Sequence, residues 1–509
     1  MADSYLKRIL QAQVYDVAQE TPIEPAKSLS QRLQNQVLLK REDLQPVFSF
    51  KIRGAYNKMA NLSDEQKRRG VITASAGNHA QGVALGATGL GIKAVIVMPK
   101  TTPEIKVVSV RAFGAQVVLH GDTFDEAYEY ARQREAREGF TFVHPYDDPD
   151  VIAGQGTIGM EILRQHTGPL EAIFIPVGGG GLIAGVACYI KYLNPGIKII
   201  GVEPRDSACL QAAMAAGERV ILDQVSLFAD GVAVKQIGEE TFRLAQQYVD
   251  EVITVTTDEI CAAIKDIFDD TRSICEPAGA LSVAGLKKYV DRESLEGESL
   301  MAITSGANVN FDRLRHIAER SELGEKREAL FAVTIPERPG SFLQFCDSLG
   351  KRSITEFNYR YAKDKDAQVF VGVQTTGIAG ETEEIHRKLE AKGYAVTDLS
   401  DNEMAKLHVR YMVGGHGPSK DGNGVPDEVL FRFQFPERPG ALLQFLIKLG
   451  AKWNISLFHY RNHGAAFGRV VVGLQVPESQ REVLIQYFDE LGYPNWDETN
   501  NPAYELFLR

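Results

Sequence analysis

Short apolar runs alternate with helical patterns over the first part of the chain. Five runs rich in β-branched residues are predicted to be buried strands, because apolar residues fill them. They cover residues 71–73, 94–97, 116–119, 173–175 and 198–200, and a sixth run follows at 300–304. Between two of them, Phe124, Ala127, Tyr128 and Ala131 recur with the spacing of one helix face. Strands that alternate with helices predict an α/β region whose mostly parallel sheet is covered by helices on both faces.

Beyond residue 320 the pattern becomes a repeat. The segment Pro336–Gly340 recurs one hundred residues later as Pro436–Gly440. The match continues, one residue out of step, from 357–360 to 458–461 and from 371–373 to 472–474. Such matched identities in two places indicate a duplication rather than a compositional bias.

Each repeat reads strand, helix, strand, strand, helix, strand, which is the ferredoxin-like order. In the first repeat the second helix is predicted at 381–390 and the last strand at 394–399. Residues 413–427, rich in Gly, Pro, Ser and Asp, are predicted to be the linker. We therefore expect three domains, which cover residues 1–320, 329–401 and 428–500.

Composition excludes several classes of protein. A chain of 509 residues with a net charge of −11 is ordinary for a multidomain globular protein and argues against nucleic-acid binding. No apolar run is long enough for a membrane span, and the pattern at residues 1–30 is not that of a signal peptide. The five scattered cysteines are expected to be reduced thiols. These features together predict a cytoplasmic location.

Four consecutive glycines, Gly178, Gly179, Gly180 and Gly181, follow a predicted strand and open a helix near Leu182. Without Cβ atoms the backbone can bend so that N–H groups converge on an anion at the helix N-terminus. The run therefore predicts a phosphate cradle, although a flexible connection remains an alternative. The spacing of the glycines also fits a loose dinucleotide-binding motif, with Glu203 where an acid would bind the ribose. A nicotinamide-dependent oxidoreductase is therefore an alternative function.

Two polar segments carry further candidate residues. Lys51 lies in the segment Ser49–Gly54, and a lysine in such an alternating pattern is, taken alone, usually a solvated side chain. Asn78 and His79 lie in the segment Ser75–Gly82, where a polar turn follows a strand and opens a helix. On its own, Asn78 is most simply a helix N-cap, and His79 a first-turn residue with a satisfied partner.

Taken together and in this order, the lysine, asparagine and glycine segments, followed by Ser305–Asn308, resemble the fold-type II pyridoxal-phosphate enzymes. That family includes threonine and serine dehydratases, serine racemase, threonine synthase and cysteine synthase. The resemblance covers residues 1–320. The segment Glu276–Ala280 and the two repeats narrow it to the biosynthetic threonine deaminases, and at that level it spans the whole chain. In that family two ACT-like regulatory domains follow a two-subdomain catalytic domain.

The resemblance implies a role for each candidate. Lys51 would hold pyridoxal phosphate covalently and later act as the base, and Phe50 would pack against the ring. Asn78 would bind the ring hydroxyl, Gly178 to Leu182 would hold the phosphate, and Ser305 would face the pyridine nitrogen. The turn formed by Ser75, Ala76, Gly77 and Asn78 would receive the substrate carboxylate.

The resemblance also implies the reaction, which is deamination of L-threonine to 2-oxobutanoate and ammonia, with L-serine as a second substrate. Serine racemase has a serine at the position of Ala76, and an alanine cannot exchange protons, so racemisation is disfavoured. No metal is expected, since only Glu203 suggests a ligand.

Regulation and assembly are implied in the same way. The family suggests a homotetramer. Isoleucine would inhibit the enzyme, and valine would oppose that inhibition. Tyr359 and Tyr460 occupy matched positions of the repeats and would either line an effector pocket or pack in the core. A non-catalytic amino-acid sensor with a relic catalytic domain is a third hypothesis, although every catalytic position is intact.

Overall fold

The computed structural model describes the chain except for residues 1, 227, 351, 361–365, 379, 408, 413–424, 437–440, 451, 462–466, 503, 505–507 and 509. The described residues form two compact units, Met1–Gly324 and Glu325–Arg509. Most of the predicted linker, and the greater part of the second Pro-Glu-Arg-Pro-Gly segment, lie outside the described residues.

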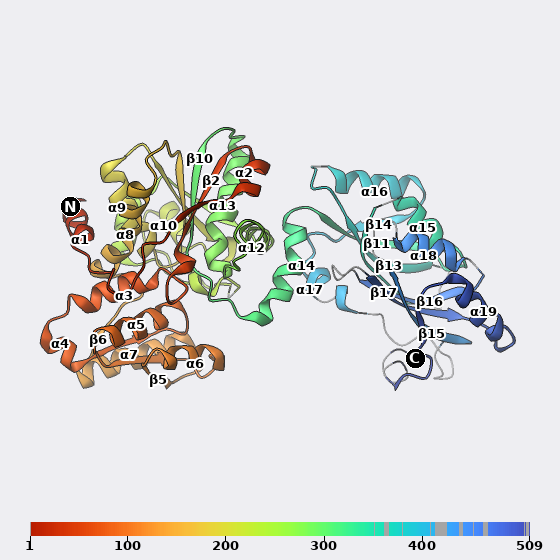
Figure 1. Cartoon of the computed structure of the whole chain (residues 1–509), viewed down its shortest axis with the longest axis horizontal. Helices are drawn as coiled ribbons and strands as arrows, with labels where there is room; N and C mark the ends of the chain where they lie inside the picture. The colour runs from red at the N-terminus through yellow and green to blue at the C-terminus, as the bar shows by residue number, and fades with distance from the viewer. Residues whose placement is uncertain are drawn as a thin grey trace. The chain divides into compact units, whose positions relative to one another are not determined.

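The first unit contains two sheets (Figure 1). The larger has the order β1-β2-β10-β7-β8-β9, and β1 is its antiparallel edge strand. The smaller has the order β5-β4-β3-β6 and is parallel throughout. The strands of the larger sheet are β1 (Ile23–Pro25), β2 (Gln36–Arg41), β7 (Ala172–Pro176), β8 (Lys198–Pro204), β9 (Glu251–Val255) and β10 (Ser299–Thr304). Those of the smaller are β3 (Val71–Ala74), β4 (Ala94–Met98), β5 (Gln116–Leu119) and β6 (Thr141–Phe142).

Helices cover both faces of the larger sheet. Along β7, Ile173 and Ile175 join the core formed with α8 (Pro149–Gln165) and α9 (Gly181–Leu193). Phe174 joins the opposite core, formed with α12 (Thr257–Thr271) and α13 (Pro277–Glu293). Because successive strand residues point to opposite faces, a strand that is covered on both sides is mostly apolar, as β7 is. This confirms the predicted α/β class.

The other helices of this unit connect the strands. They are α1 (Ala2–Leu10), α2 (Lys27–Leu33), α3 (Lys51–Ala60), α4 (Asp64–Arg69), α5 (Asn78–Gly89), α6 (Glu104–Ala112), α7 (Phe124–Glu138), α10 (Cys209–Ala216), α11 (Glu239–Tyr248) and α14 (Leu314–Gly324). Four short 3-10 turns join them, namely η1 (Glu42–Leu44), η2 (Arg205–Ser207), η3 (Asp230–Val232) and η4 (Phe311–Arg313).

The second unit consists of two repeats with the predicted ferredoxin-like order. The first contains β11 (Glu328–Pro336), α15 (Ser341–Leu349), β12 (Ile354–Arg360), β13 (Asp366–Gln374), α16 (Glu381–Ala391) and β14 (Ala395–Asp398). The second contains β15 (Glu428–Pro436), α18 (Ala441–Leu449), β16 (Asn454–Arg461), β17 (Phe467–Gln475), α19 (Arg481–Leu491) and β18 (Asn495–Asp497). Between them lie α17 (Glu403–Leu407) and η5 (Val409–Tyr411), and η6 (Glu478–Gln480) precedes α19.

The two repeats share one antiparallel sheet of the order β14-β11-β13-β12-β16-β17-β15-β18. They meet through β12 and β16, where Phe357 lies opposite Tyr460 and Tyr359 opposite Phe458. The repeats are thus joined edge to edge, and each covers the edge strand that the other would expose.

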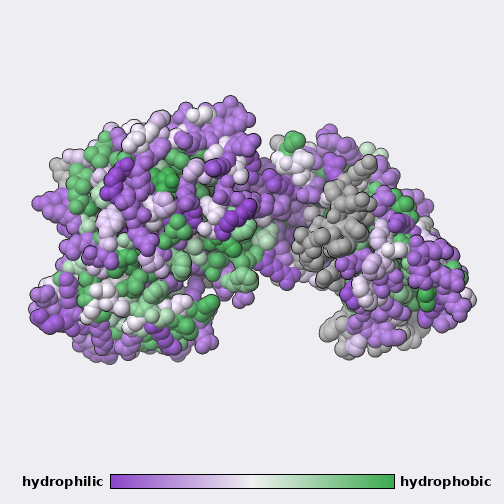
Figure 2. All heavy atoms as spheres, viewed as in Figure 1, coloured by the Kyte–Doolittle hydropathy of each residue, from purple (hydrophilic) through white to green (hydrophobic). Residues whose placement is uncertain are grey.

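Hydrophilic side chains predominate on the face of both units shown in Figure 2, with apolar side chains scattered among them. No helix in the described part of the chain is long and apolar enough to cross a membrane.

Candidate active site and effector pocket

The candidate catalytic residues come together where the parallel strands of the first unit end. The glycine run follows β7, Ser75 follows β3, and Ser305 follows β10. Ligands of open α/β sheets bind at such carboxyl ends. One cavity here is lined by the predicted residues Phe50, Lys51, Asn78, Gly178, Gly179, Gly180, Gly181, Leu182 and Ser305. It is also lined by residues for which the sequence predicted no role, namely Tyr146, Pro176, Gly231, Val232, Glu276 and Ala278.

Lys51 begins α3 at the edge of this cavity. Its Nζ donates to the carbonyl oxygen of Pro145 at 2.9 Å and lies 5.3 Å from the centre of the Phe50 ring. Burial lowers the pKa of this amine to about 8, and the Glu276 carboxylate opposes part of that shift. Lys51 is thus enclosed in the cavity wall rather than solvated, and its lowered pKa gives it a larger neutral fraction near physiological pH than an ordinary lysine has.

The glycine run packs closely on three sides. A Cβ at Gly179 would lie 2.2 Å from the Tyr146 ring, and one at Gly178 would lie 2.9 Å from Cα of Val232. Gly180 has a φ of +92°, and a Cβ there would meet Ile237 and Thr241 rather than the cavity. The absent Cβ atoms therefore let neighbouring residues approach the loop closely, in addition to the freedom to bend that the glycine run predicted.

Helix α9 begins directly after this loop at Gly181, and its N-cap Gly180 supplies no side-chain hydrogen bond. The first N–H groups of a helix have no partner within it and carry its positive dipole end. These N–H groups and the close packing around the glycines fit a phosphate-bearing cofactor.

Asn78 is the first residue of α5, and Gly77 holds the N-cap position. The Asn78 side chain does not cap the helix. Its Nδ2 donates to Glu276 Oε1 at 2.5 Å, and its Oδ1 accepts from Asn308 Nδ2 at 2.6 Å. The N-cap interpretation of Asn78 is therefore wrong, and its amide is held in place from both ends.

The neighbouring His79 has the satisfied partner that its simpler interpretation required. Its Nε2 lies 2.9 Å from the carbonyl oxygen of Val143, and burial lowers its pKa to about 3. It is therefore a neutral buried imidazole. Ser75, Ala76 and Gly77 form the partly exposed turn before Asn78 and are not among the residues that line the cavity.

Ser305 directly follows its strand and lies close to Lys51 in the cavity wall. The carbonyl oxygen of Ser305 accepts from the N–H of Phe50 at 3.2 Å, and its buried Oγ lies 3.4 Å from the carbonyl oxygen of Ala278. This neutral hydroxyl fits a neutral pyridine nitrogen, for which an aspartate would be unsuitable.

Glu203 does not have the free carboxylate that a nicotinamide enzyme would need. Its two oxygens accept from the N–H groups of Leu210 and Gln211 at 2.8 and 2.9 Å. Burial raises its pKa to about 7. Among the residues that the structure places, no group of three or more His, Cys, Asp or Glu side chains could hold a metal ion.

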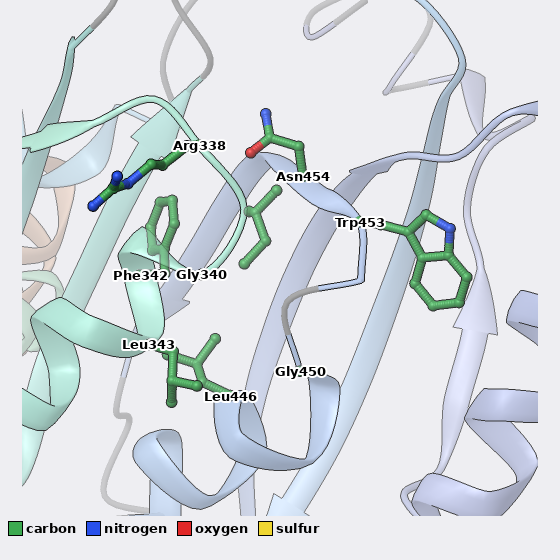
Figure 3. A pocket seen from close by; sticks show the side chains of 9 residues that line it. Arg338, Gly340, Phe342, Leu343, Leu446, Gly450, Trp453 and Asn454 are labelled. Atoms are coloured by element: carbon green, nitrogen blue, oxygen red, sulfur yellow. The ribbon is translucent and has the colours of Figure 1, made fainter.

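In the second unit, a pocket lies between the repeats (Figure 3). Figure 3 shows Arg338 and Asn454 on one side of it, and Leu343 and Leu446 on the opposite side. The pocket is lined by Arg338, Gly340, Phe342, Leu343, Leu446, Gly450, Trp453, Asn454 and Ile455.

Neither predicted effector tyrosine lines this pocket directly. Tyr359 is 2% exposed, packs against Phe342 at 4.7 Å, and donates its hydroxyl to Glu337 Oε2 at 2.5 Å. Asn454, which lines the pocket, donates to the other oxygen of Glu337 at 3.2 Å. Tyr460 is 1% exposed and stacks on Phe435. Tyr359 is thus connected to the pocket through Glu337, which is hydrogen-bonded to both Tyr359 and Asn454. Tyr460 is packed in the core.

Comparison with known proteins decides the family. Residues 14–306 match the family model described as pyridoxal-phosphate dependent enzyme. Residues 319–409 and 421–508 match the C-terminal regulatory domain of threonine dehydratase. The chain is 58% identical to the biosynthetic L-threonine dehydratase of Burkholderia multivorans and 57% identical to that of Escherichia coli. These alignments cover 99% of this chain, and 99% and 97% of those proteins. The chain belongs to the biosynthetic threonine dehydratase family.

Solved structures agree with this family. Tomato (Solanum lycopersicum) threonine deaminase isoform 2, in its processed form, is 52% identical with a TM-score of 0.63 and matches 63% of this chain and 88% of that one. A threonine deaminase from T.th. is 37% identical with a TM-score of 0.57 and matches 60% of this chain and 98% of that one. The first unit is accordingly a fold-type II pyridoxal-phosphate domain, followed by regulatory domains, as the sequence predicted.

Proposed function

We propose that this member of the family deaminates L-threonine to 2-oxobutanoate and ammonia, the first committed step toward isoleucine. The observation that supports it most is the convergence of Lys51, the glycine run and Ser305 on one cavity. The names of its relatives, which are threonine dehydratases over nearly the whole chain, support the substrate.

Each residue has a task in this reaction. Lys51 would bind the cofactor covalently, and the N–H groups from Gly178 to Leu182 would bind its phosphate. When bound, pyridoxal phosphate supplies an electron sink for the negative charge that develops at the α-carbon. Asn78 would bind the ring hydroxyl, and Ser305 would face the ring nitrogen.

Lys51 then acts a second time. With threonine bound, the free amine of Lys51 would take the α-proton, and its lowered pKa of about 8 suits it to this role. The β-hydroxyl departs as water. The enamine that is released takes up one water, and its hydrolysis gives 2-oxobutanoate and ammonia.

The turn from Ser75 to Asn78 receives the substrate carboxylate, since it leads into the N-terminus of α5. L-Serine fits the same mechanism and would give pyruvate. Because Ala76 has no hydroxyl, the face opposite Lys51 lacks a proton donor, and D-serine is not expected as a product.

The direct test is to add L-threonine to purified protein and measure 2-oxobutanoate. A yellow absorption that borohydride bleaches would show the covalent cofactor. Protein that binds pyridoxal phosphate but releases no 2-oxobutanoate would contradict the substrate, and colourless, inactive protein would contradict the whole assignment.

We further propose that isoleucine binds the second unit and inhibits, and that valine opposes it. An α-amino acid with an aliphatic side chain suits the pocket between the repeats. Arg338 could pair with its carboxylate, Asn454 could accept from its ammonium, and Phe342, Leu343 and Leu446 could contact its side chain. We also propose a cytoplasmic homotetramer, on family resemblance alone.

A further inference from the structure

Glu276 is a buried carboxylate that lines the catalytic cavity and had no assigned role in the sequence analysis. It is 4% exposed, and the nearby cations Lys106 and Arg313 form ion pairs with Asp230 rather than with Glu276. Burial, with a contribution from Asp230, raises its pKa to about 7. A buried acid that forms no direct ion pair is costly, which points to a functional reason for its position.

The position of Glu276 in the chain makes its contacts informative. It is the N-cap residue of α13, where a carboxylate would ordinarily accept from the first N–H groups of its own helix. Its side chain makes no such bond. Its Oε1 instead accepts from Nδ2 of Asn78, which is 198 residues away in sequence.

The surrounding backbone holds Glu276 in this position. Its N–H donates to the carbonyl oxygen of Gly306 at 3.1 Å. A Cβ at Gly306 would lie 2.5 Å from Glu276 Oε1, and one at Gly231 would lie 3.6 Å from the same atom. The carboxylate is therefore closely enclosed on two sides and directed at Asn78.

A side-chain amide offers two N–H donors and one oxygen. In Asn78 the oxygen accepts from Asn308, and one N–H is given to Glu276. Glu276 cannot serve as a donor when ionised, so this bond fixes which end of the amide is nitrogen. The second N–H of Asn78 is left for a ligand in the cavity.

We propose that Glu276 is a positioning residue that orients the Asn78 amide so that an N–H faces the hydroxyl of the bound pyridine ring. This rests on the proposed function, because the ring is that of pyridoxal phosphate. Without Glu276 the amide is held only through Asn308, whose own amide can turn over with it. The carbonyl oxygen of Asn78 could then meet the electron-rich ring oxygen.

Two substitutions at Glu276 separate the effect of side-chain length from the effect of charge. Glu276→Gln keeps the length of the side chain and an oxygen that can accept from Asn78, but it loses the negative charge. Glu276→Asp keeps the charge but is one methylene shorter and cannot reach Asn78 in the same way. Glu203→Gln is a matched control, since Glu203 is equally buried with a pKa also raised to about 7 but does not line the cavity.

The measurements are the Kd of the cofactor-free enzyme for pyridoxal phosphate and the pH midpoint of the bound cofactor's absorption change. We expect Glu276→Asp to weaken binding about tenfold, which is the size of one lost charge-assisted hydrogen bond. Glu276→Gln should bind within about threefold of the native enzyme. Its absorption midpoint should lie lower, because the lost anion no longer stabilises a protonated nitrogen on Lys51.

That midpoint depends on every charged or titratable group that acts on Glu276, namely Lys51, Asp230, Lys106, Arg313 and the Cys275 thiol. None of them is changed in these variants. Glu203→Gln should leave both binding and midpoint unchanged.

A double-mutant cycle with Asn78→Ala tests whether Glu276 acts through Asn78. In the Asn78→Ala background, Glu276→Asp should cause no further loss of cofactor affinity. Additive losses would overturn the proposal, as would native affinity in Glu276→Asp, or a Glu276→Gln variant weaker than Glu276→Asp. Native enzyme that binds no pyridoxal phosphate would instead contradict the proposed function, and the two failures are thereby distinguished.

Discussion

The backbone N–H of Phe50 donates to the carbonyl oxygen of Ser305 at 3.2 Å. Beside this bond, Ser49 forms an antiparallel bridge with Gly306, and the carbonyl oxygen of Phe48 accepts from the N–H of Ala307. The segment that carries Lys51 is thus fixed to the segment that carries the proposed partner of the ring nitrogen. The two ends of a bound ring would be held by one piece of backbone structure, which fixes their separation.

Replacing Lys51 with alanine should abolish covalent attachment of the cofactor and lower turnover of threonine by several orders of magnitude. The reason is that the attachment point and the proposed base are lost together. Absorption after borohydride treatment and 2-oxobutanoate release provide the measurements, and circular dichroism checks that the variant folds. A variant that keeps near-native turnover would contradict the assignment of Lys51.

The rate at which the cofactor-free enzyme takes up pyridoxal phosphate should depend on the protonation of Lys51. Burial disfavours the ammonium form and lowers the pKa to about 8, so the reactive neutral amine predominates above that pH. The rate should rise as pH increases toward about 8 and then level off. With Nα-acetyl-lysine as the control, the rate should keep rising toward the ordinary lysine pKa of about 10.4. An enzyme rate that also rises steadily to about pH 10 would contradict the lowered pKa.

Gly180→Val tests the structural reason for the glycine run. The positive φ costs a branched residue about 1–2 kcal/mol, and its Cβ would meet Ile237 and Thr241 at 2.7 and 2.8 Å. The loop should shift, so that the thermal unfolding midpoint falls and affinity for pyridoxal phosphate weakens. Excess cofactor should restore part of the activity.

Gly196→Ala is the matched control, since a Cβ there has no neighbour within 4 Å. Gly196→Ala should leave both the thermal unfolding midpoint and the affinity for pyridoxal phosphate unchanged. If Gly180→Val bound the cofactor as well as this control, the loop would be a simple connection.

The sequence predicted most of the fold because its strongest periodic signals come from buried elements. The run at 173–175 became β7, and the helix predicted at 381–390 is α16, Glu381–Ala391. The short strands β1 and β6 and the strands β2 and β9 were missed. In β2, the polar residues Lys40 and Arg41 break the apolar pattern, yet both are buried because they form ion pairs with Glu161 and Asp43. The split into two sheets was also not visible, since local patterns do not say which strands pair.

In the candidate site, too, local sequence patterns did not predict contacts between distant residues. Motif order identified Lys51, Asn78, Ser305 and the glycines, which the structure brings to one cavity. The motif Glu276–Ala280 contains Glu276 but gives it no role, because its bond to Asn78 is a contact between residues far apart in sequence. The available signal was an acidic residue just before Pro277 at a helix start, a position that most often indicates an ordinary cap.

Incubation with L-serine should give pyruvate and almost no D-serine. Ala76 lies in the turn before α5 and has no hydroxyl to return a proton to the opposite face of the substrate. Chiral chromatography of the remaining serine measures this. Ala76→Ser should add only a trace of D-serine, because a base also needs a tuned environment. Substantial D-serine from the native enzyme would contradict the role given to Ala76.

The last prediction concerns inhibition by isoleucine. Truncation after Gly324, where the first unit ends, should leave threonine turnover but remove the inhibition. The threonine deaminase from T.th. matches only 60% of this chain with 98% of its own length, which supports a catalytic unit that folds without the second. In the full-length enzyme, an effector must bind two states with different affinity, and such coupling is typically about 1–3 kcal/mol, or about 5- to 150-fold.

Substitutions in the second unit should therefore shift the isoleucine curve and leave uninhibited turnover roughly intact. Arg338→Gln removes the proposed partner of the effector carboxylate, and Tyr359→Phe removes the hydroxyl that bonds Glu337 behind Asn454. The expected shift is larger for Arg338, because it would contact the effector directly. Arg387→Gln is the control, since this arginine is exposed on α16 and does not line the pocket. Tyr460→Phe should shift the curve less than Arg338→Gln, because Tyr460 is packed in the core against Phe435 and does not line the pocket. A full-length enzyme that responds to neither isoleucine nor valine would contradict the regulatory proposal and leave the repeats with a role in assembly.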